Sequence, residues 1–176
     1  QQGILFTQQG KFAEAQSQFG KALERSIALE NNDQRIRTLQ QLSNTFIQAG
    51  DAAKAHQYSQ QAMELARQSN MENLTTAGLI EIGNAYLIKG DLAEAEKTYS
   101  EALRLAKLYN GRFNEARAML ALGSLRKQQD DPEGARDYSQ RALLFFQQGN
   151  YGRQMFVAYV NLGFAHAELG DYESAK

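Results

Sequence analysis

The sequence has no cysteine, which excludes disulfide bonds and cysteine-ligated zinc. It has one proline in 176 residues, which is compatible with long helices, because a proline inside a helix costs about 3 kcal/mol. The net charge is −1, so no positive field attracts nucleic acid or anionic lipid. No apolar run approaches the roughly 20 residues of a membrane span, and no signal peptide is recognised. We therefore expect no nucleic-acid partner, no membrane partner and a cytoplasmic location.

Small and turn-forming residues recur along the chain at one fixed interval. The turn positions are Gly10, Gly50, Gly90, Asp130 and Gly170. An alanine column consists of Ala15, Ala55, Ala95, Ala135 and Ala175, and a second one, seven residues later, of Ala22, Ala62, Ala102 and Ala142. Such a fixed period is typical of a solenoid in which each repeat stacks on its neighbours. The sequence thus predicts an all-α repeat protein and a binding scaffold, but not what is bound.

Each repeat predicts two helices. In the third repeat an apolar face at helical spacing ends at Gly90, and Asp91, with Glu94 three residues later, is typical of a helix start. Pro132 follows Asp131, at the first helical position, where proline is best tolerated. We expect helices near residues 1–9, 11–30, 34–49, 51–69, 73–89, 91–109, 113–129, 131–148 and 152–169, and the start of a further helix at Asp171. A small-residue column in the first helices, which lets paired helices lie close, consists of Gly3, Gly83, Gly123 and Gly163, with Ser43 as the one substitute.

Two segments carry a family resemblance: IGNAYLIKGDLAEAEKTYSEAL (82–103) and LGFAHAELGDYESA (162–175). They resemble tetratricopeptide repeats, whose usual length is about 34 residues. The 40-residue form is similar to kinesin light chains, Leu-Gly-Asn repeat adaptors and bacterial regulators. The resemblance implies a right-handed α-solenoid, here one domain over residues 1–176 with repeats at 1–35, 36–75, 76–115, 116–155 and 156–176. The first and last repeats are truncated, so we expect a piece of a longer protein.

Two columns depart from the family pattern. Arg126 and His166 stand where Phe6, Phe46 and Tyr86 stand in the other repeats. The aromatic residue of the second helix is Phe19 or Tyr99 in odd repeats, but lies one position earlier, at Tyr58 and Tyr138, in even ones. We expect these shifts to change local packing and to leave the architecture intact.

In tetratricopeptide proteins the first helix of each repeat lines a concave groove, and the resemblance implies peptide binding there. The lining transferred to this sequence is Arg37, Gln40, Gln41, Asn44, Gln48, Ile80, Glu81, Asn84, Leu87, Ile88, Arg117, Leu120, Ser124, Lys127, Val160, Asn161 and Phe164. The carboxylate clamp of chaperone adaptors is absent, because only Asn44 and Arg117 fit it and Glu81 would repel a carboxylate.

Asn44 and Asn84 are the most informative of these residues, because they occupy one column. A carboxamide both donates and accepts, so a pair of them can hydrogen-bond the backbone of an extended peptide whatever its sequence. The alternative is that asparagine is merely tolerated at a solvated helix position. The pattern is compatible with an extended ligand and with a helical one.

No catalytic residues, metal or cofactor are predicted. The two histidines, His56 and His166, lie on different helices without a carboxylate cluster, and no serine or threonine has a base supplied by a motif. The leading hypothesis is a non-enzymatic adaptor that binds a protein or peptide. A second is a regulatory or sensor segment of a larger enzyme, such as a protein kinase, or of a transcription regulator. A third is end-to-end self-association through the truncated repeats.

Overall fold

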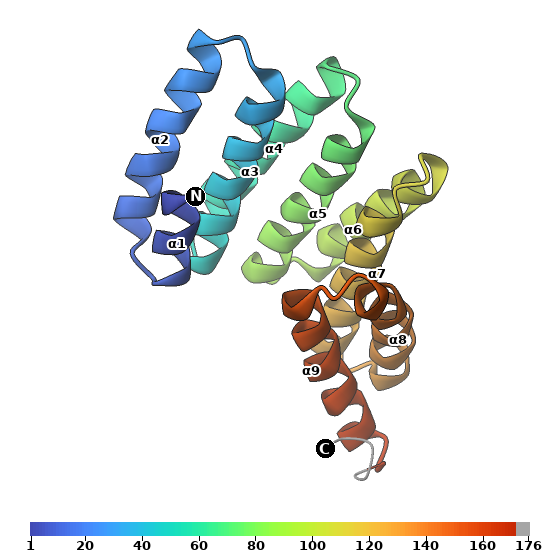
Figure 1. Cartoon of the computed structure of the whole chain (residues 1–176). Coiled ribbons are helices and arrows are strands. Elements are labelled where there is room, and N and C mark those ends of the chain that lie inside the picture. The colour runs from blue at the N-terminus through green and yellow to red at the C-terminus, as the bar shows by residue number, and fades with distance from the viewer. Residues whose placement is uncertain (172–176) are drawn as a thin grey trace. The chain divides into compact units, whose positions relative to one another are not determined.

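The computed structural model describes residues 1–171, and every regular element within them is an α-helix (Figure 1). The helices are α1 (Gln2–Gln8), α2 (Phe12–Ala28), α3 (Asn32–Gln48), α4 (Ala52–Gln68), α5 (Glu72–Lys89), α6 (Leu92–Leu108), α7 (Arg112–Gln128), α8 (Pro132–Gln148) and α9 (Gly152–Glu168). They belong to two compact units, Gln1–Asp91 and Leu92–Lys176. Within each unit consecutive helices pack on each other, and the first helices of successive repeats also touch: α3 contacts α1 and α5, and α7 contacts α9.

The predicted helices are confirmed, with ends that differ by no more than two residues. Asp51 and Asp131 act as caps at the starts of α4 and α8. The Asp51 carboxylate accepts a hydrogen bond from the Lys54 backbone N–H at 3.1 Å, and Asp131 accepts one from Gly134 at 2.9 Å. Such caps satisfy backbone donors that lack a partner within the helix. The helix expected after Asp171 lies outside the described residues.

Every turn between the described helices passes through one residue with a positive φ. The glycines of the turn column have φ between 72° and 81°, and Asp130, in the same column, has φ 55°. In the other turn, Asn70, Asn110 and Asn150 have φ of 52–53°. Asparagine and glycine adopt this left-handed region at low cost, which explains both columns. Glu30 takes the same place in the first repeat with φ 51°, without either advantage.

Replacing Glu30 by glycine should therefore stabilise the protein by about 0.5–1 kcal/mol, because relief of the left-handed strain exceeds the entropy cost of a glycine. Thermal unfolding followed by circular dichroism measures the change. The matched control is Glu24→Gly, in the interior of α2, which should lower stability by about 1 kcal/mol. A fall in melting temperature for both variants would contradict the assignment of strain to Glu30.

The alanine columns lie at the contacts between helices. Ala15, Ala55, Ala95 and Ala135 are fully buried, as are Ala62, Ala102 and Ala142. Ala22 is half-buried instead, because α1 has only seven residues and does not extend over it. Ala175 lies outside the described residues. Apart from Ala22, the alanines of both columns within the described residues thus mark packing contacts between helices.

The small residues of the first helices and the shifted aromatic residues of the second helices are related, because the two columns lie opposite each other. A Cβ atom on Gly3 would lie 2.8 Å from the ring of Phe19, so this glycine makes room for the aromatic ring. In the second repeat the position opposite Ser43 is Ser59, and their hydroxyls share a hydrogen bond of 2.6 Å. The aromatic residue there has moved to Tyr58, which stacks on Phe46 at 5.4 Å.

At the position of Arg126, an ion pair takes the place of a contact between aromatic side chains. In the first unit the aromatic at this position, Tyr86, packs edge-on against His56 with ring centroids 5.0 Å apart. In the second unit, Arg126 Nη2 donates to Glu96 Oε1 at 2.5 Å. Gln129 joins them by accepting from Arg126 at 2.7 Å and donating to Glu96 at 3.3 Å. His56 and Glu96 occupy one column of the repeat, as Tyr86 and Arg126 do, so the chemistry of the contact changes while its place is kept.

His166, the other departure in this column, is half-buried in α9. Its Nδ1 atom lies 3.2 Å from an Asp171 carboxylate oxygen. His166 thus stands in the aromatic column of the repeat and contacts the turn that follows α9.

Stability should decrease on acidification through two groups. Hydrogen bonds from Arg126 and Gln129 lower the pKa of the Glu96 carboxyl below its ordinary value. Burial and, second to it, Lys89 lower the pKa of His56. Both groups bind protons more weakly in the folded than in the unfolded chain, so stability is lost below about pH 6.5 for His56 and below about pH 4.3 for Glu96. Each loss should be no more than about 1 kcal/mol, since both side chains are partly exposed.

Urea unfolding at a series of pH values between 7.5 and 3 measures this dependence. The variant His56→Phe should remove the loss in the upper range, and Glu96→Gln should reduce the loss in the lower range. If both variants keep the pH dependence of the unmodified protein, other groups are responsible for it.

Candidate peptide-binding surface

The predicted lining residues of the first unit come from α3 and α5. These two helices contact each other, so the lining residues of successive repeats come from neighbouring helices. Three of these side chains are exposed: Arg37, Gln48 and Ile88. Six more are half-buried: Gln40, Gln41, Asn44, Glu81, Asn84 and Leu87. This set forms the first-unit face, a mainly polar surface with an apolar margin at Leu87 and Ile88.

The corresponding set in the second unit comes from α7 and α9. Val160 is exposed, and Arg117, Ser124, Lys127 and Phe164 are half-buried. The Lys127 ammonium lies 5.6 Å from the centroid of the Phe164 ring, a favourable cation–π arrangement. An accessible aromatic with a cation above it is a suitable element of a binding surface, because aromatic residues are enriched at interfaces.

Three predicted lining residues are buried. The prediction that they lie on an accessible surface was wrong. Ile80 keeps 3% of its surface, Leu120 8% and Asn161 3%. Leu120 belongs to the apolar core formed by α7, α8 and α9. The Asn161 amide donates to the Ser124 hydroxyl at 3.0 Å and so connects α9 to α7. In the folded chain these three residues have little surface left to offer a ligand.

Gln40 also has a structural contact that the sequence did not reveal. Its side-chain amide donates to the Leu74 carbonyl at 3.2 Å, which connects α3 to the first turn of α5. A second polar contact joins α1 to α3: the hydroxyls of Thr7 and Thr45 lie 2.9 Å apart, and both are buried. The Gln40 bond joins α3 to α5, the two helices that carry Asn44 and Asn84, and so helps to set the distance between them.

Asn44 and Asn84 are both half-buried on the first-unit face, and each has a hydrogen bond within its own helix. Asn44 Oδ1 accepts from Gln48 Nε2 at 3.3 Å, and Asn84 Nδ2 donates to Glu81 Oε2 at 3.3 Å. These bonds are longer than the usual length of about 2.9–3.0 Å and join flexible side chains. They can be exchanged for bonds to a ligand at small cost.

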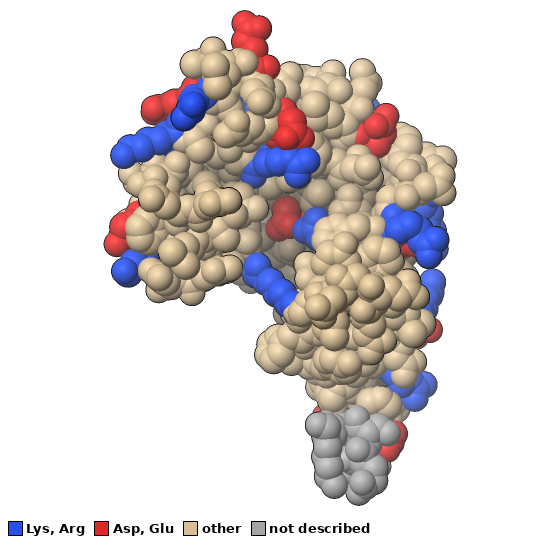
Figure 2. Space-filling model, in the orientation of Figure 1, with Lys and Arg blue, Asp and Glu red and all other residues tan. Residues whose placement is uncertain are grey.

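Charged side chains on these faces are few, and each of the two described next has a partner one turn earlier in its own helix. Arg37 donates to Asp33 at 2.8 Å, one turn earlier in α3, and Arg117 donates to Asn114 at 3.4 Å. In the view of Figure 2, basic and acidic residues are scattered among uncharged ones and no large area of one sign is seen. Exposed pairs of this kind contribute little energy. Recognition on these faces would therefore depend on hydrogen bonds and apolar contacts.

Across residues 1–171 no group of three or more His, Cys, Asp or Glu side chains is placed to hold a metal ion. Likewise, none of the helices α1–α9 is long and apolar enough to cross a membrane. His56 Nδ1 is buried without a hydrogen-bond partner, but its neighbour is the Tyr86 ring and not a carboxylate.

The chain belongs to the tetratricopeptide repeat family. The family pattern matches residues 1–68 and 74–148, and a second tetratricopeptide repeat pattern matches residues 156–176. The predicted class, an all-α tetratricopeptide solenoid, is thus confirmed. The comparison with curated proteins found no match.

Solved structures with the same fold share little sequence with this chain. BtubC (BKLC) from P. vanneervenii is 22% identical, with a TM-score of 0.74 over 98% of this chain and 72% of that one. A Rap protein complexed with Competence and Sporulation Factor is 18% identical, with a TM-score of 0.86 over 99% of this chain and 49% of that one. The kinesin light chain-like TPR repeats from P. anserina are 13% identical, with a TM-score of 0.67 over 98% of this chain and 85% of that one. The chain thus spans about half the length of the Rap protein, and at these identities the likeness shows the fold.

Proposed function

We propose that this chain is a non-enzymatic scaffold that binds an extended peptide segment of a protein partner on the first-unit face. The observation that carries the proposal is the pair of carboxamides at Asn44 and Asn84. They occupy equivalent positions on two helices that touch, they are partly accessible, and the bonds that join Asn44 to Gln48 and Asn84 to Glu81 are long. Tetratricopeptide family membership supports a protein partner in general, and the asparagine pair supports a specific mode of binding.

The chemistry of the face suits an extended backbone. A peptide in extended conformation presents N–H and C=O groups, and a carboxamide satisfies one of each. Leu87 and Ile88 lie within one turn of Asn84 on α5, so a ligand side chain next to the bonded backbone would find an apolar contact. Backbone bonds would give affinity to many sequences, and the apolar contact would select among them.

A random peptide library displayed on phage provides a test that needs no known partner. Peptides selected on the unmodified protein should bind the variant Asn44→Ala/Asn84→Ala more weakly. The structural control is a circular dichroism spectrum and melting temperature close to those of the unmodified protein. Selected peptides that bind both proteins equally, or that crosslink only to the second helices α2 and α4, would contradict the proposal.

The alternative is a regulatory segment of a larger protein. It is supported by the likeness in fold to the Rap structure and to aspartyl phosphate phosphatase F from Bacillus subtilis, of which this chain covers 49% and 46%. In that case the same face would receive a signal and transmit it to another domain. Expressing the full-length protein and measuring its activity with and without a selected peptide distinguishes the two: an activity that the peptide changes favours regulation.

A further inference from the structure

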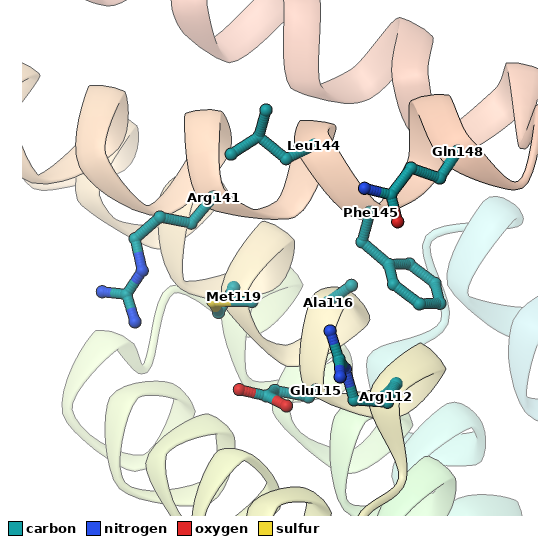
Figure 3. A pocket seen from close by; sticks show the side chains of 8 residues that line it. All are labelled: Arg112, Glu115, Ala116, Met119, Arg141, Leu144, Phe145 and Gln148. Atoms are coloured by element: carbon teal, nitrogen blue, oxygen red, sulfur yellow. The ribbon is translucent and has the colours of Figure 1, made fainter.

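A cavity of about 310 Å³ opens in the fourth repeat, between the beginning of α7 and the end of α8 (Figure 3). Its floor is apolar and includes Ala116 and Met119 of α7, with Phe145 of α8 as one wall. Arg112 lies near that wall and Arg141 on the other side, as Figure 3 shows. None of these residues belongs to the lining predicted from the sequence. The cavity lies wholly within the second unit.

The residues that line this cavity differ from their equivalents in the second and third repeats. The place of Ala116 is taken by Ile36 in the second repeat, and the smaller alanine leaves room on the floor. The places of Arg112 and Arg141 are taken by Asn32 and Gln61 in the second repeat and by Glu72 and Glu101 in the third. Two arginines at these positions are therefore a property of the fourth repeat alone among these three.

The apolar wall is held rigidly. The Phe145 ring stacks on Tyr151 with centroids 6.0 Å apart and meets Phe146 edge-on at 5.8 Å, while Phe113 contacts it at 6.3 Å. A ring fixed by three others loses little freedom when a ligand binds, which favours affinity. Leu144 extends the apolar area, because 63% of its surface is exposed.

The charges at the rim favour an acidic ligand. Arg112 and Arg141 face a single acidic lining residue, Glu115. Arg141 is paired with Asp137 at 3.2 Å, one turn earlier in α8, and both side chains are about half exposed. Such a surface pair contributes only about 0.3–0.5 kcal/mol, so a ligand carboxylate can compete with Asp137. Arginine also binds carboxylates in a two-pronged geometry.

We propose that this cavity is a second docking site, independent of the first-unit face, for a protein segment in which an apolar side chain is flanked by acidic residues. The volume is at the lower end of the roughly 300–1,000 Å³ that small-ligand sites occupy, and it suits an anchoring side chain such as leucine or phenylalanine. The anchor lies over Ala116 and against Phe145. Acidic residues on either side of it pair with Arg112 and Arg141.

The test uses the same phage library of random peptides, selected on the unmodified protein and then on variants. The charge variant is Arg112→Glu, which a helix start tolerates because acidic residues are favourable there. Its matched control is Arg153→Glu, the same change near the start of α9 and outside the cavity. The apolar variant is Leu144→Gln, at an exposed position that does not disturb the core.

We expect a group of selected peptides that carry Asp or Glu beside Leu, Ile, Met or Phe. Their affinity should fall about tenfold or more in Arg112→Glu and in Leu144→Gln, and by less than about twofold in Arg153→Glu. It should also fall when salt is raised from about 50 to about 500 mM, because part of the attraction is between partly exposed charges.

The variant Asn44→Ala/Asn84→Ala should leave these peptides unaffected, which separates this site from the first-unit face. A library that yields no acidic and apolar peptides, or peptides that bind Arg112→Glu and Leu144→Gln as well as the unmodified protein, would overturn the proposal. Peptides that lose affinity only in the asparagine variant would also overturn it, while supporting the proposed function.

Discussion

The variant Phe146→Ala is expected to lose about 3–5 kcal/mol of the free energy of unfolding. Phe146 is fully buried in α8 and belongs to the core that α7, α8 and α9 share. Its ring meets those of Phe113, Phe145 and Tyr151 with centroids 5.8–6.3 Å apart. Removing it takes away apolar burial and these ring contacts, and it leaves a cavity between helices that cannot close fully.

Urea denaturation followed by far-ultraviolet circular dichroism measures the loss. Phe156→Ala is the matched control, because the chemical change is the same and Phe156 on α9 is 69% exposed; it should change stability by less than about 0.5 kcal/mol. If Phe146→Ala does not fold, Phe146→Leu keeps most of the volume and should still lose more than the control. Equal losses for the buried and the exposed position would show that this core does not hold the second unit together.

The positions of the helices could be predicted because their signals are local. A capping aspartate, a glycine or asparagine at a left-handed turn, and an apolar stripe at helical spacing each act within a few residues. These signals recur in successive repeats, so the helix boundaries of one repeat could be checked against those of the others. The left-handed Glu30 had no such signal in its own residue type. Only its place in the repeat, one period before Asn70, could have indicated it.

Burial on the first helices could not be predicted in the same way. Within each unit a first helix packs against second helices and against another first helix, so only a narrow strip remains accessible. Ile80, Leu120 and Asn161 lie close to that strip in helical projection but are covered. Sequence periodicity gives the side of a helix that is apolar, but not how far a neighbouring helix overlaps it. The amide contacts of Gln40 and Asn161 reduce the accessible strip further.

Contacts between side chains of successive repeats were missed for another reason. Glu96 and Arg126 pair across helices, as His56 and Tyr86 do in the first unit. Comparing the repeats column by column would have shown that both members of the pair change together. The basic cavity of the fourth repeat is a similar case, since Arg112 and Arg141 lie on different helices and only the fold brings them to one rim. In this chain, departures from the repeat thus mark contacts that are particular to one repeat.

The double variant Asn44→Ala/Asn84→Ala should weaken peptide binding to the first-unit face by roughly one to two orders of magnitude. Each asparagine is expected to contribute hydrogen bonds worth about 0.5–1.5 kcal/mol to the ligand backbone. Alanine is the best helix former, and neither asparagine is fully buried, so the helices should remain intact. Affinities of selected peptides, measured by fluorescence anisotropy, give the size of the loss.

The matched control is Asn32→Ala/Asn73→Ala, which removes one exposed carboxamide from α3 and one from α5 outside the predicted lining. It should leave affinity unchanged within about twofold. Two further results identify the backbone as the bonded group. The loss in the Asn44 and Asn84 variant should be similar for peptides of different sequence, and salt should have little effect because this face has few charges to screen.

Side-chain selectivity should depend on different residues of the same face. Ile80 is buried, so a polar residue there would destabilise the fold, and the informative positions are Leu87 and Ile88 at the accessible margin. Ile88→Gln should weaken peptides with an apolar residue at the contact and leave polar peptides nearly unchanged. If instead it weakens all peptides equally while the asparagine variant weakens none, ligands are held by apolar contact alone. The carboxamide pair would then have no part in recognition.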